Sequence, residues 1–188
     1  METVMETERI IFIRPHVQYI QDMIEVLNNR EVSTFISNTP FYLTEEDEIE
    51  WVNEHQDGLT FSMVTKDTNE FIGNCGFNEI QDNSGVIGIF LSPKFQNIGL
   101  GTEAITELIR FGFEDLNLEE IRLVVFSHNE RAIRCYQKLG FREYKRDNDV
   151  ARRQNQAIDD IYMVLRRWKY KRKEGIKLNH TYTKRDLL

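Results

Sequence analysis

Residues 96–101, with the sequence QNIGLG, decide the fold of this 188-residue chain. They follow an apolar run at residues 86–92, which predicts a buried strand, and lead into apolar residues at helical spacing. A strand, a glycine loop and a helix in this order favour anion binding, because the free amides of a helix start point outward at the positive end of its dipole. Gly99 and Gly101 have no Cβ, so the backbone can approach a phosphate closely. The loop therefore predicts a pyrophosphate site.

Two widespread phosphate-binding loops are excluded by spacing. A dinucleotide-binding fingerprint needs G-x-G-x-x-G after a first strand, and a P-loop ends in GK followed by Ser or Thr. Residues 96–101 fit neither pattern. Glycines at a strand-to-helix turn often serve tight geometry alone, so the prediction of a ligand needs support from a second segment.

That second segment is residues 129–141, NERAIRCYQKLGF, which predict a short helix with both ends specified. Asn129 is an N-capping residue, and Gly140 stands where a helix ends, before the apolar Phe141. One face of this helix carries positions i, i+3, i+4 and i+7, which are Asn129, Ala132, Ile133 and Tyr136. That face must turn toward the sheet or toward a ligand bound against it.

The remaining sequence predicts a mixed sheet with helices. Strands are predicted at residues 7–15, 59–65, 70–78, 86–92, 121–126, 141–146 and 158–167. Helices are predicted at residues 17–27, 44–58, 101–116 and 129–139, the second of them from a capping box at Thr44. We expect one domain over residues 1–168 and a basic C-terminal tail over residues 169–188, with only the first few residues and the tail detachable.

The net charge of −7 is unevenly distributed. The tail holds seven Lys and Arg against two acids, so the body, with 17 basic and 29 acidic residues, carries −12. Such a body repels nucleic-acid backbones and attracts cationic partners, so no DNA partner is expected. No segment approaches the roughly 20 apolar residues of a membrane span, and the N-terminus is acidic, so a cytoplasmic protein without a membrane partner is expected.

The two cysteines, Cys75 and Cys135, make no disulfide framework. They have no clustered His partner, so no metal site is expected. We interpret both as buried packing residues.

Together, residues 96–101 and 129–141 resemble the two signature segments of the GNAT acetyltransferases, in the same order. The resemblance extends to TERIIFIRP, FIGN, GTEA and YMVL, at residues 7–15, 71–74, 101–104 and 162–165. The pattern is most similar to the subgroup that acetylates ribosomal-protein N-termini, with spermidine and antibiotic acetyltransferases as relatives. This implies a single-domain α/β fold with a twisted mixed sheet, whose fourth and fifth strands, residues 86–92 and 121–126, splay apart to admit acetyl-CoA.

The resemblance also implies which residues bind the coenzyme. Backbone groups of Phe90, Leu91 and Ser92 would pair with the pantetheine arm like an extra strand. The pyrophosphate would lie on the loop amides of Asn97, Gly99, Leu100, Gly101 and Thr102. Gln96, at the start of the loop, and Asn129 and Ala132, on the helix predicted at residues 129–139, would belong to the same site.

Tyr136 matches the position whose phenol protonates the departing thiolate. A phenol with a pKa of about 10 can give a proton to a thiolate whose acid has a pKa near 8.5. A tyrosine that only packs is the alternative.

The general base is the least determined part of the site. The position where some relatives carry a glutamate is Val124 here. Glu79, just beyond the third strand, is the candidate that remains, acting directly or through a water, and an ordinary surface glutamate is the alternative. His128 is interpreted as a turn residue.

The sequence thus predicts an acetyl-CoA-dependent N-acetyltransferase that works by direct attack in a ternary complex. Three acceptor hypotheses stay open: a protein or peptide N-terminus first, then a small amine such as a polyamine or an aminoglycoside, and last a non-catalytic acyl-CoA-binding module. The acceptor is expected to enter near residues 28–44. Edge strands of such sheets often pair, so the sequence also allows a homodimer.

Overall fold

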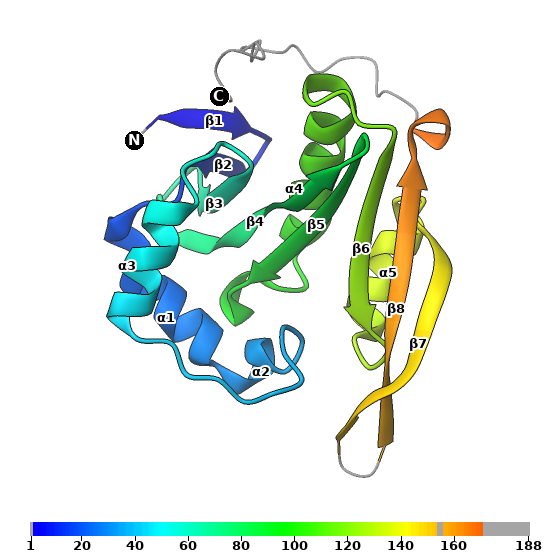
Figure 1. Cartoon of the computed structure of the whole chain (residues 1–188). Coiled ribbons are helices and arrows are strands. Elements are labelled where there is room, and N and C mark those ends of the chain that lie inside the picture. The colour runs from blue at the N-terminus through cyan, green and yellow to red at the C-terminus, as the bar shows by residue number, and fades with distance from the viewer. Residues whose placement is uncertain (1, 154–155, 171–188) are drawn as a thin grey trace.

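The computed structural model describes residues 2–153 and 156–170, and within these ranges the chain forms one mixed eight-stranded sheet (Figure 1). The strands are β1 Thr3–Glu6, β2 Ile10–Ile13, β3 Thr60–Thr65, β4 Phe71–Gln81, β5 Ser84–Leu91, β6 Glu120–Phe126, β7 Arg142–Arg153 and β8 Gln156–Arg166. Their order across the sheet is β1-β2-β3-β4-β5-β6-β8-β7. Every neighbouring pair is antiparallel except β5 and β6, which are parallel. The predicted single α/β domain is confirmed.

Helices cover both faces of the sheet. The α-helices are α1 Ile20–Asn28, α2 Arg30–Ser33, α3 Glu45–Glu54, α4 Leu100–Arg110 and α5 Glu130–Lys138. Single 3-10 turns lie at Val17–Tyr19, Pro93–Phe95 and Arg167–Lys169, and a π-helical turn at Phe111–Asp115 continues α4. Helices α1 to α3 share one hydrophobic cluster with β2 to β4, whereas α4 and α5 pack into a larger cluster on the other face. No helix within the described ranges is long and apolar enough to cross a membrane.

The sheet opens between β5 and β6. These strands pair only from Ser84 opposite Glu120 to Val86 opposite Arg122, and beyond that point they diverge (Figure 1). On its other side, β6 pairs with β8 along all seven of its residues. The predicted splayed pair is therefore confirmed, although the two strands are the fifth and sixth because β1 precedes the strand that the sequence indicated first.

The N-terminal segment belongs to the sheet, which corrects the expectation that the first few residues are detachable. Thr3–Glu6 pairs antiparallel with β2, and Val4 and Met5 are only 5% and 7% exposed in the larger cluster. A four-residue strand is too short to show a periodic pattern, so its partner decides its structure.

At the other end, the packed chain reaches Tyr170. Its ring lies 5.1 Å from that of Phe113, and its hydroxyl donates a hydrogen bond to Glu114 at 2.8 Å. Residues 171–188, which make up most of the predicted basic tail, lie outside the described residues.

Candidate active site

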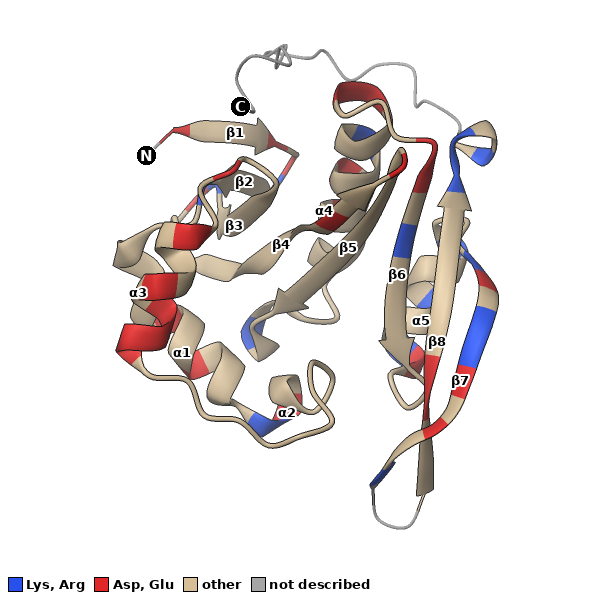
Figure 2. Cartoon of the chain, viewed as in Figure 1, with Lys and Arg blue, Asp and Glu red and all other residues tan. Residues whose placement is uncertain are grey.

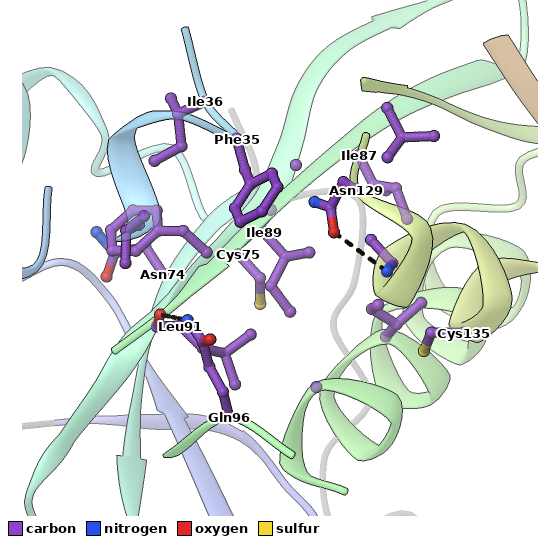
Figure 3. Close-up of a pocket in the computed structure, with 18 of the residues that line it drawn as sticks. Phe35, Ile36, Asn74, Cys75, Ile87, Ile89, Leu91, Gln96, Asn129 and Cys135 are labelled. Atoms are coloured by element: carbon purple, nitrogen blue, oxygen red, sulfur yellow. Dashed lines mark hydrogen bonds between the residues drawn. The ribbon is translucent and has the colours of Figure 1, made fainter. Parts of the chain in front are cut away.

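A cavity of about 910 Å³ lies where β5 and β6 diverge. One part of its lining comes from the region of α1 to α3, and another from the glycine loop, α4 and α5. Figure 3 shows Asn74 and Phe35 on one side of this space and Asn129 and Cys135 on the other. The cavity thus connects the two faces of the sheet at the point where strand pairing stops.

The glycine loop forms one wall of the cavity. Asn97 and Gly99 have φ angles of 65° and 90°, in the left-handed region that Asn and Gly adopt most readily, and α4 begins directly after them. The predicted residues that line the wall are Gln96, Asn97, Gly99, Gly101 and Thr102. Leu100 instead buries its side chain in the core, so only its backbone could serve a ligand.

The loop is held in place from two directions. The side chain of Gln96 donates to the carbonyl of Leu91 at 2.8 Å, which ties the loop to the end of β5 (Figure 3). From the other side, the guanidinium of Arg9 donates to the carbonyl of Ile98 at 2.9 Å and pairs with Glu103 at 2.7 Å. The geometry of the glycine loop therefore depends on a residue almost ninety positions earlier in the chain.

Helix α5 forms the facing wall. The side chain of Asn129 accepts a hydrogen bond from the amide of Ala132 at 3.2 Å, which confirms the predicted N-cap. Two contacts join α5 to the loop side: Cys135 Sγ lies 3.3 Å from Thr102 Oγ1, and Arg131 donates to Asn97 at 3.3 Å. Cys135 is half-buried, which corrects the expectation that it is buried, whereas Cys75 is buried as expected. Both cysteines line the cavity.

Cationic side chains accompany the glycine loop at this end of the cavity. Three basic residues of α5 line it, and they are Arg131, Arg134 and Lys138. They occur at i, i+3 and i+7 within residues 129–141, so the sequence carries a signal for them, although they are not among the predicted site residues. A polyanion such as the phosphates of coenzyme A fits this combination of cations and helix-start amides.

Tyr136 is 9% exposed and lines the cavity. Its ring packs at 63° against Phe141, with ring centroids 5.9 Å apart. Burial raises the pKa of the phenol, and the neighbouring Cys135 raises it further, so the hydroxyl holds its proton throughout the physiological pH range. The phenol is therefore protonated where Tyr136 lines the cavity.

Two acids of α3 lie at the opposite part of the cavity, and they differ in their surroundings. Asp47 accepts hydrogen bonds from the amide and the hydroxyl of Thr44, both at 2.7 Å, and these bonds lower its pKa. Glu48 is 3% exposed, and its Oε2 has no hydrogen-bond partner among the residues that the structure describes. Burial, as the largest cause, raises the pKa of Glu48, and the charge of Asp47 raises it further.

Glu48 is not among the residues predicted from the sequence, although a signal was present. Trp51 and Val52 lie three and four positions after it and carry the buried stripe of α3. An acid on this stripe must be buried. Figure 2 shows why this acid does not stand out, because acidic residues are concentrated on α3 and Glu48 is one of several.

Asn74 is a second polar residue that the sequence did not single out. It is 4% exposed at the centre of β4 and lines the cavity (Figure 3). Its Oδ1 accepts a hydrogen bond from the hydroxyl of Ser62 at 2.9 Å, whereas its Nδ2 has no partner within the described residues. Two residues of the lining, Glu48 and Asn74, therefore each carry a buried polar atom without a hydrogen-bond partner within the described residues.

The structure does not bring Glu79 to this site. Phe77 lies opposite Ile87 and Glu79 opposite Val86, so Asn78 is the extra residue of a β-bulge. Of the described residues that line the cavity, Asn78 is one and Glu79 is not, and Glu79 is exposed. A bulge shifts the alternation of side chains along β4, and the sequence does not reveal it.

Val124 lies in the lining of the cavity, and His128 packs near it. Val124 lines it from β6, where it offers no base. The ring of His128 stacks on Phe35 with centroids 5.0 Å apart, and its Nε2 lies 3.2 Å from the carbonyl oxygen of Thr34. His128 thus connects the segment after α2 with the turn before α5.

Known proteins show a consistent likeness to this chain. A family model described as an acetyltransferase (GNAT) domain matches residues 9–142. The uncharacterized N-acetyltransferase p20 of Bacillus licheniformis is 30% identical over 170 residues, which cover 87% of this chain and 94% of the relative. A spermidine N(1)-acetyltransferase of Escherichia coli is 45% identical over 53 residues, which are 28% of each chain.

A solved structure has the same fold. The spermidine N-acetyltransferase from Vibrio cholerae, in complex with CoA and spermine, superposes with a TM-score of 0.76 at 22% identity, covering 87% of this chain and 98% of that chain. At this identity the likeness concerns the fold alone. The family model and the relative p20 span most of the sequence, including the glycine loop and α5. The chain therefore belongs to the GNAT family and is an acetyl-CoA-dependent N-acetyltransferase.

Proposed function

We propose that the chain transfers the acetyl group to a primary amine by direct attack, with both substrates bound in the one cavity. The observation that carries this proposal is the continuity of the cavity between the glycine loop and the α1 to α3 region. A coenzyme held at the loop and an acceptor entering from the opposite side would meet between β5 and β6. No covalent acetyl-enzyme is then required.

The glycine loop and the end of β5 would hold the coenzyme. The coenzyme pyrophosphate would bind to the amides of Asn97, Gly99, Leu100, Gly101 and Thr102. Gln96, Asn129 and Ala132 would lie beside it, with the cations of α5 at the same wall. The amide of Ser92 already donates to Ile72 of β4 at 2.8 Å. Because amides alternate between the two edges of a strand, that of Leu91 faces the diverging edge, where the pantetheine arm would pair as an added strand.

Tyr136 would protonate the departing thiolate. Its place in the lining supports this role, and the phenol is protonated at the pH where the thiolate forms. Glu79 receives no role in the proposal, because it does not share the cavity with Tyr136.

A protein or peptide N-terminus is our first acceptor, on the strength of the sequence pattern that resembles the ribosomal-protein subgroup. A small amine is the second, favoured by the acids Asp47 and Glu48 at the acceptor side and by the spermidine acetyltransferases among the similar proteins. An α-amine with a pKa near 8 needs less deprotonation than a lysine-type amine near 10.4.

The test is free-thiol release from acetyl-CoA by the purified protein, with peptides bearing a free Ser or Ala N-terminus, spermidine and an aminoglycoside as parallel acceptors. Release above the rate without acceptor is expected with one class and would identify it. Tight acetyl-CoA binding with no release from any acceptor would instead support the non-catalytic module.

A further inference from the structure

The carboxyl group of Glu48 is buried and, within the part of the chain that the structure describes, lacks a partner that would compensate its charge. Only 3% of the residue is exposed, and its Oε2 has no hydrogen-bond partner among the described residues. Burial of a carboxylate without a partner is unfavourable, and proteins normally satisfy such a group. Because Glu48 lines the cavity, a bound cation can compensate the charge of this carboxylate.

We propose that Glu48 binds the ammonium group of the acceptor and then accepts the proton that the amine loses during attack. The inference rests on the proposed function, since it assumes that the acceptor enters on the α3 side. It assigns the general base that the sequence left open, and it places cation recognition and proton removal on one side chain.

Asp47, the other acid in this lining, is not available for this role. Its carboxylate accepts the two hydrogen bonds from Thr44 that cap α3, so it stabilises the helix that carries Glu48. Glu50, two residues further along α3, is exposed and does not line the cavity. Of these three acids, only Glu48 combines burial, an unused oxygen and access to the cavity.

The bonds and protons of the proposed acetyl transfer balance with the groups that line the cavity, the two substrates and solvent. The bound ammonium releases one proton to solvent, and the neutral nitrogen forms a bond to the thioester carbonyl carbon while its next proton passes to the Glu48 carboxylate. The carbon–sulfur bond breaks, and sulfur takes a proton from the Tyr136 phenol. The products are the acetylated amine and free CoA, after which Glu48 returns its proton to solvent and Tyr136 regains one.

Because of its surroundings, Glu48 is a stronger base than an ordinary surface carboxylate. Burial and Asp47 raise its pKa, whereas His55 lowers it, and the net direction is upward. A carboxylate with a raised pKa holds a proton more strongly. Below that pKa Glu48 is already protonated and accepts none, so the acidic limb of kcat/KM should report this residue.

Trp51 provides a test that does not depend on activity. It lines the same cavity one turn after Glu48, and replacing the exposed Trp168 by Phe leaves Trp51 as the only tryptophan of the chain. In this background, titration with butylamine at neutral pH should change the Trp51 fluorescence at lower concentration than titration with butanol. Glu48→Gln should weaken the butylammonium response about tenfold, as expected for loss of a hydrogen bond to a charged group, and Glu50→Gln should not.

Kinetics test the proton transfer. With the best acceptor, Glu48→Gln should lower kcat/KM about a hundredfold and remove its acidic limb while acetyl-CoA affinity is kept, and Glu48→Asp should restore part of the activity. Equal butylammonium affinity in the wild type and Glu48→Gln, or an unchanged pH profile, would overturn the role of Glu48. Because the titration contains no acetyl-CoA, it decides on Glu48 separately, and failure of the wild type to acetylate any amine would count against the proposed function instead.

Discussion

At the residue scale, burial sets the protonation of the side chains in and behind the cavity. It raises the pKa of Tyr136, of Glu48 and of the Cys75 thiol, because the charged form of each loses hydration. Asp47, next to Glu48, shows the opposite direction, because hydrogen bonds from Thr44 stabilise its charged form. Neighbouring acids on one helix therefore differ in chemistry through their contacts and not through their residue type.

Replacing Tyr136 by Phe tests the proton donor. We expect acetyl-CoA affinity to stay nearly unchanged and kcat to fall about a hundredfold, because the ring packing on Phe141 is kept and only the donor is lost. Calorimetry and thiol release measure the two quantities. Tyr144→Phe, at an exposed position of β7, is the matched control, and equal turnover in both variants would show that water or another group protonates the thiolate.

Replacing Gly99 by Glu tests whether the glycine loop binds acetyl-CoA. Gly99 has a φ of 90°, so Glu adds backbone strain as well as a negative charge where a phosphate is expected, and acetyl-CoA binding should disappear. Asn tolerates left-handed φ angles, as Asn97 shows, so Gly99→Asn should bind with a modest loss. Unchanged affinity of the Glu variant in calorimetry would exclude the loop from coenzyme binding.

At the scale of the elements, the N-terminal strands help to shape the glycine loop. Arg9, just before β2, joins Ile98 of the loop and Glu103 of α4, and the hydroxyl of Thr7 donates to the same Glu103 at 2.6 Å. Hydrogen bonds from Thr7 and Arg9 outweigh burial and lower the pKa of Glu103, so it is charged at neutral pH. The first turn of α4 is therefore fixed from outside as well as by its own backbone.

Arg9→Ala should weaken acetyl-CoA binding about tenfold with little change in the melting temperature. The side chain of Arg9 is 46% exposed, so its ion pair adds little global stability, whereas loss of its bond to Ile98 frees the loop. Calorimetry and thermal unfolding provide the two readouts. Lys66→Ala, which removes the surface pair with Glu6 at 3.3 Å, is the control and should leave binding intact. A large loss of stability without a binding defect in the Arg9 variant would refute the proposal that Arg9 holds the glycine loop in its binding geometry.

At the scale of the whole molecule, the cavity results from a sheet that is closed at one end and open at the other. The three-residue pairing of β5 with β6 joins the two halves, and the larger cluster continues across it from β1 to β8. At the open end, the stacking of Phe35 on His128 brings the two halves together again. The core therefore extends from Val4 to Tyr170, and the cavity is a gap in the sheet and not a gap between domains.

Met5→Ala tests whether β1 is an integral part of this core. Truncation of a buried methionine costs about 2 kcal/mol, and Met5 is 7% exposed, so the free energy of unfolding in urea should fall by about that amount. Glu2→Ala, at an exposed position just before β1, should change it by less than about 0.5 kcal/mol. Equal stability of the two variants would mean that β1 contributes nothing to folding.

Some features of the chain were determined by the sequence alone, and they are local. The loop at residues 96–101, the Asn129 cap and the capping box at Thr44 depend on neighbouring residues, so periodicity and backbone preference reveal them. The resemblance of two such segments to one family then indicated the activity, which the family model confirmed.

Other features were decided only by the tertiary structure, because they depend on how segments pack and pair. The contact of Arg9 with the loop joins residues almost ninety positions apart, and the pairing of β1 and the bulge at Asn78 that leaves Glu79 outside depend on the register of neighbouring strands. Glu48 is the clearest case, since four consecutive acids open α3 and their sequence does not distinguish them. Burial of one helix face against α1 and the cavity made that single carboxylate different, and burial is a property of the packed molecule.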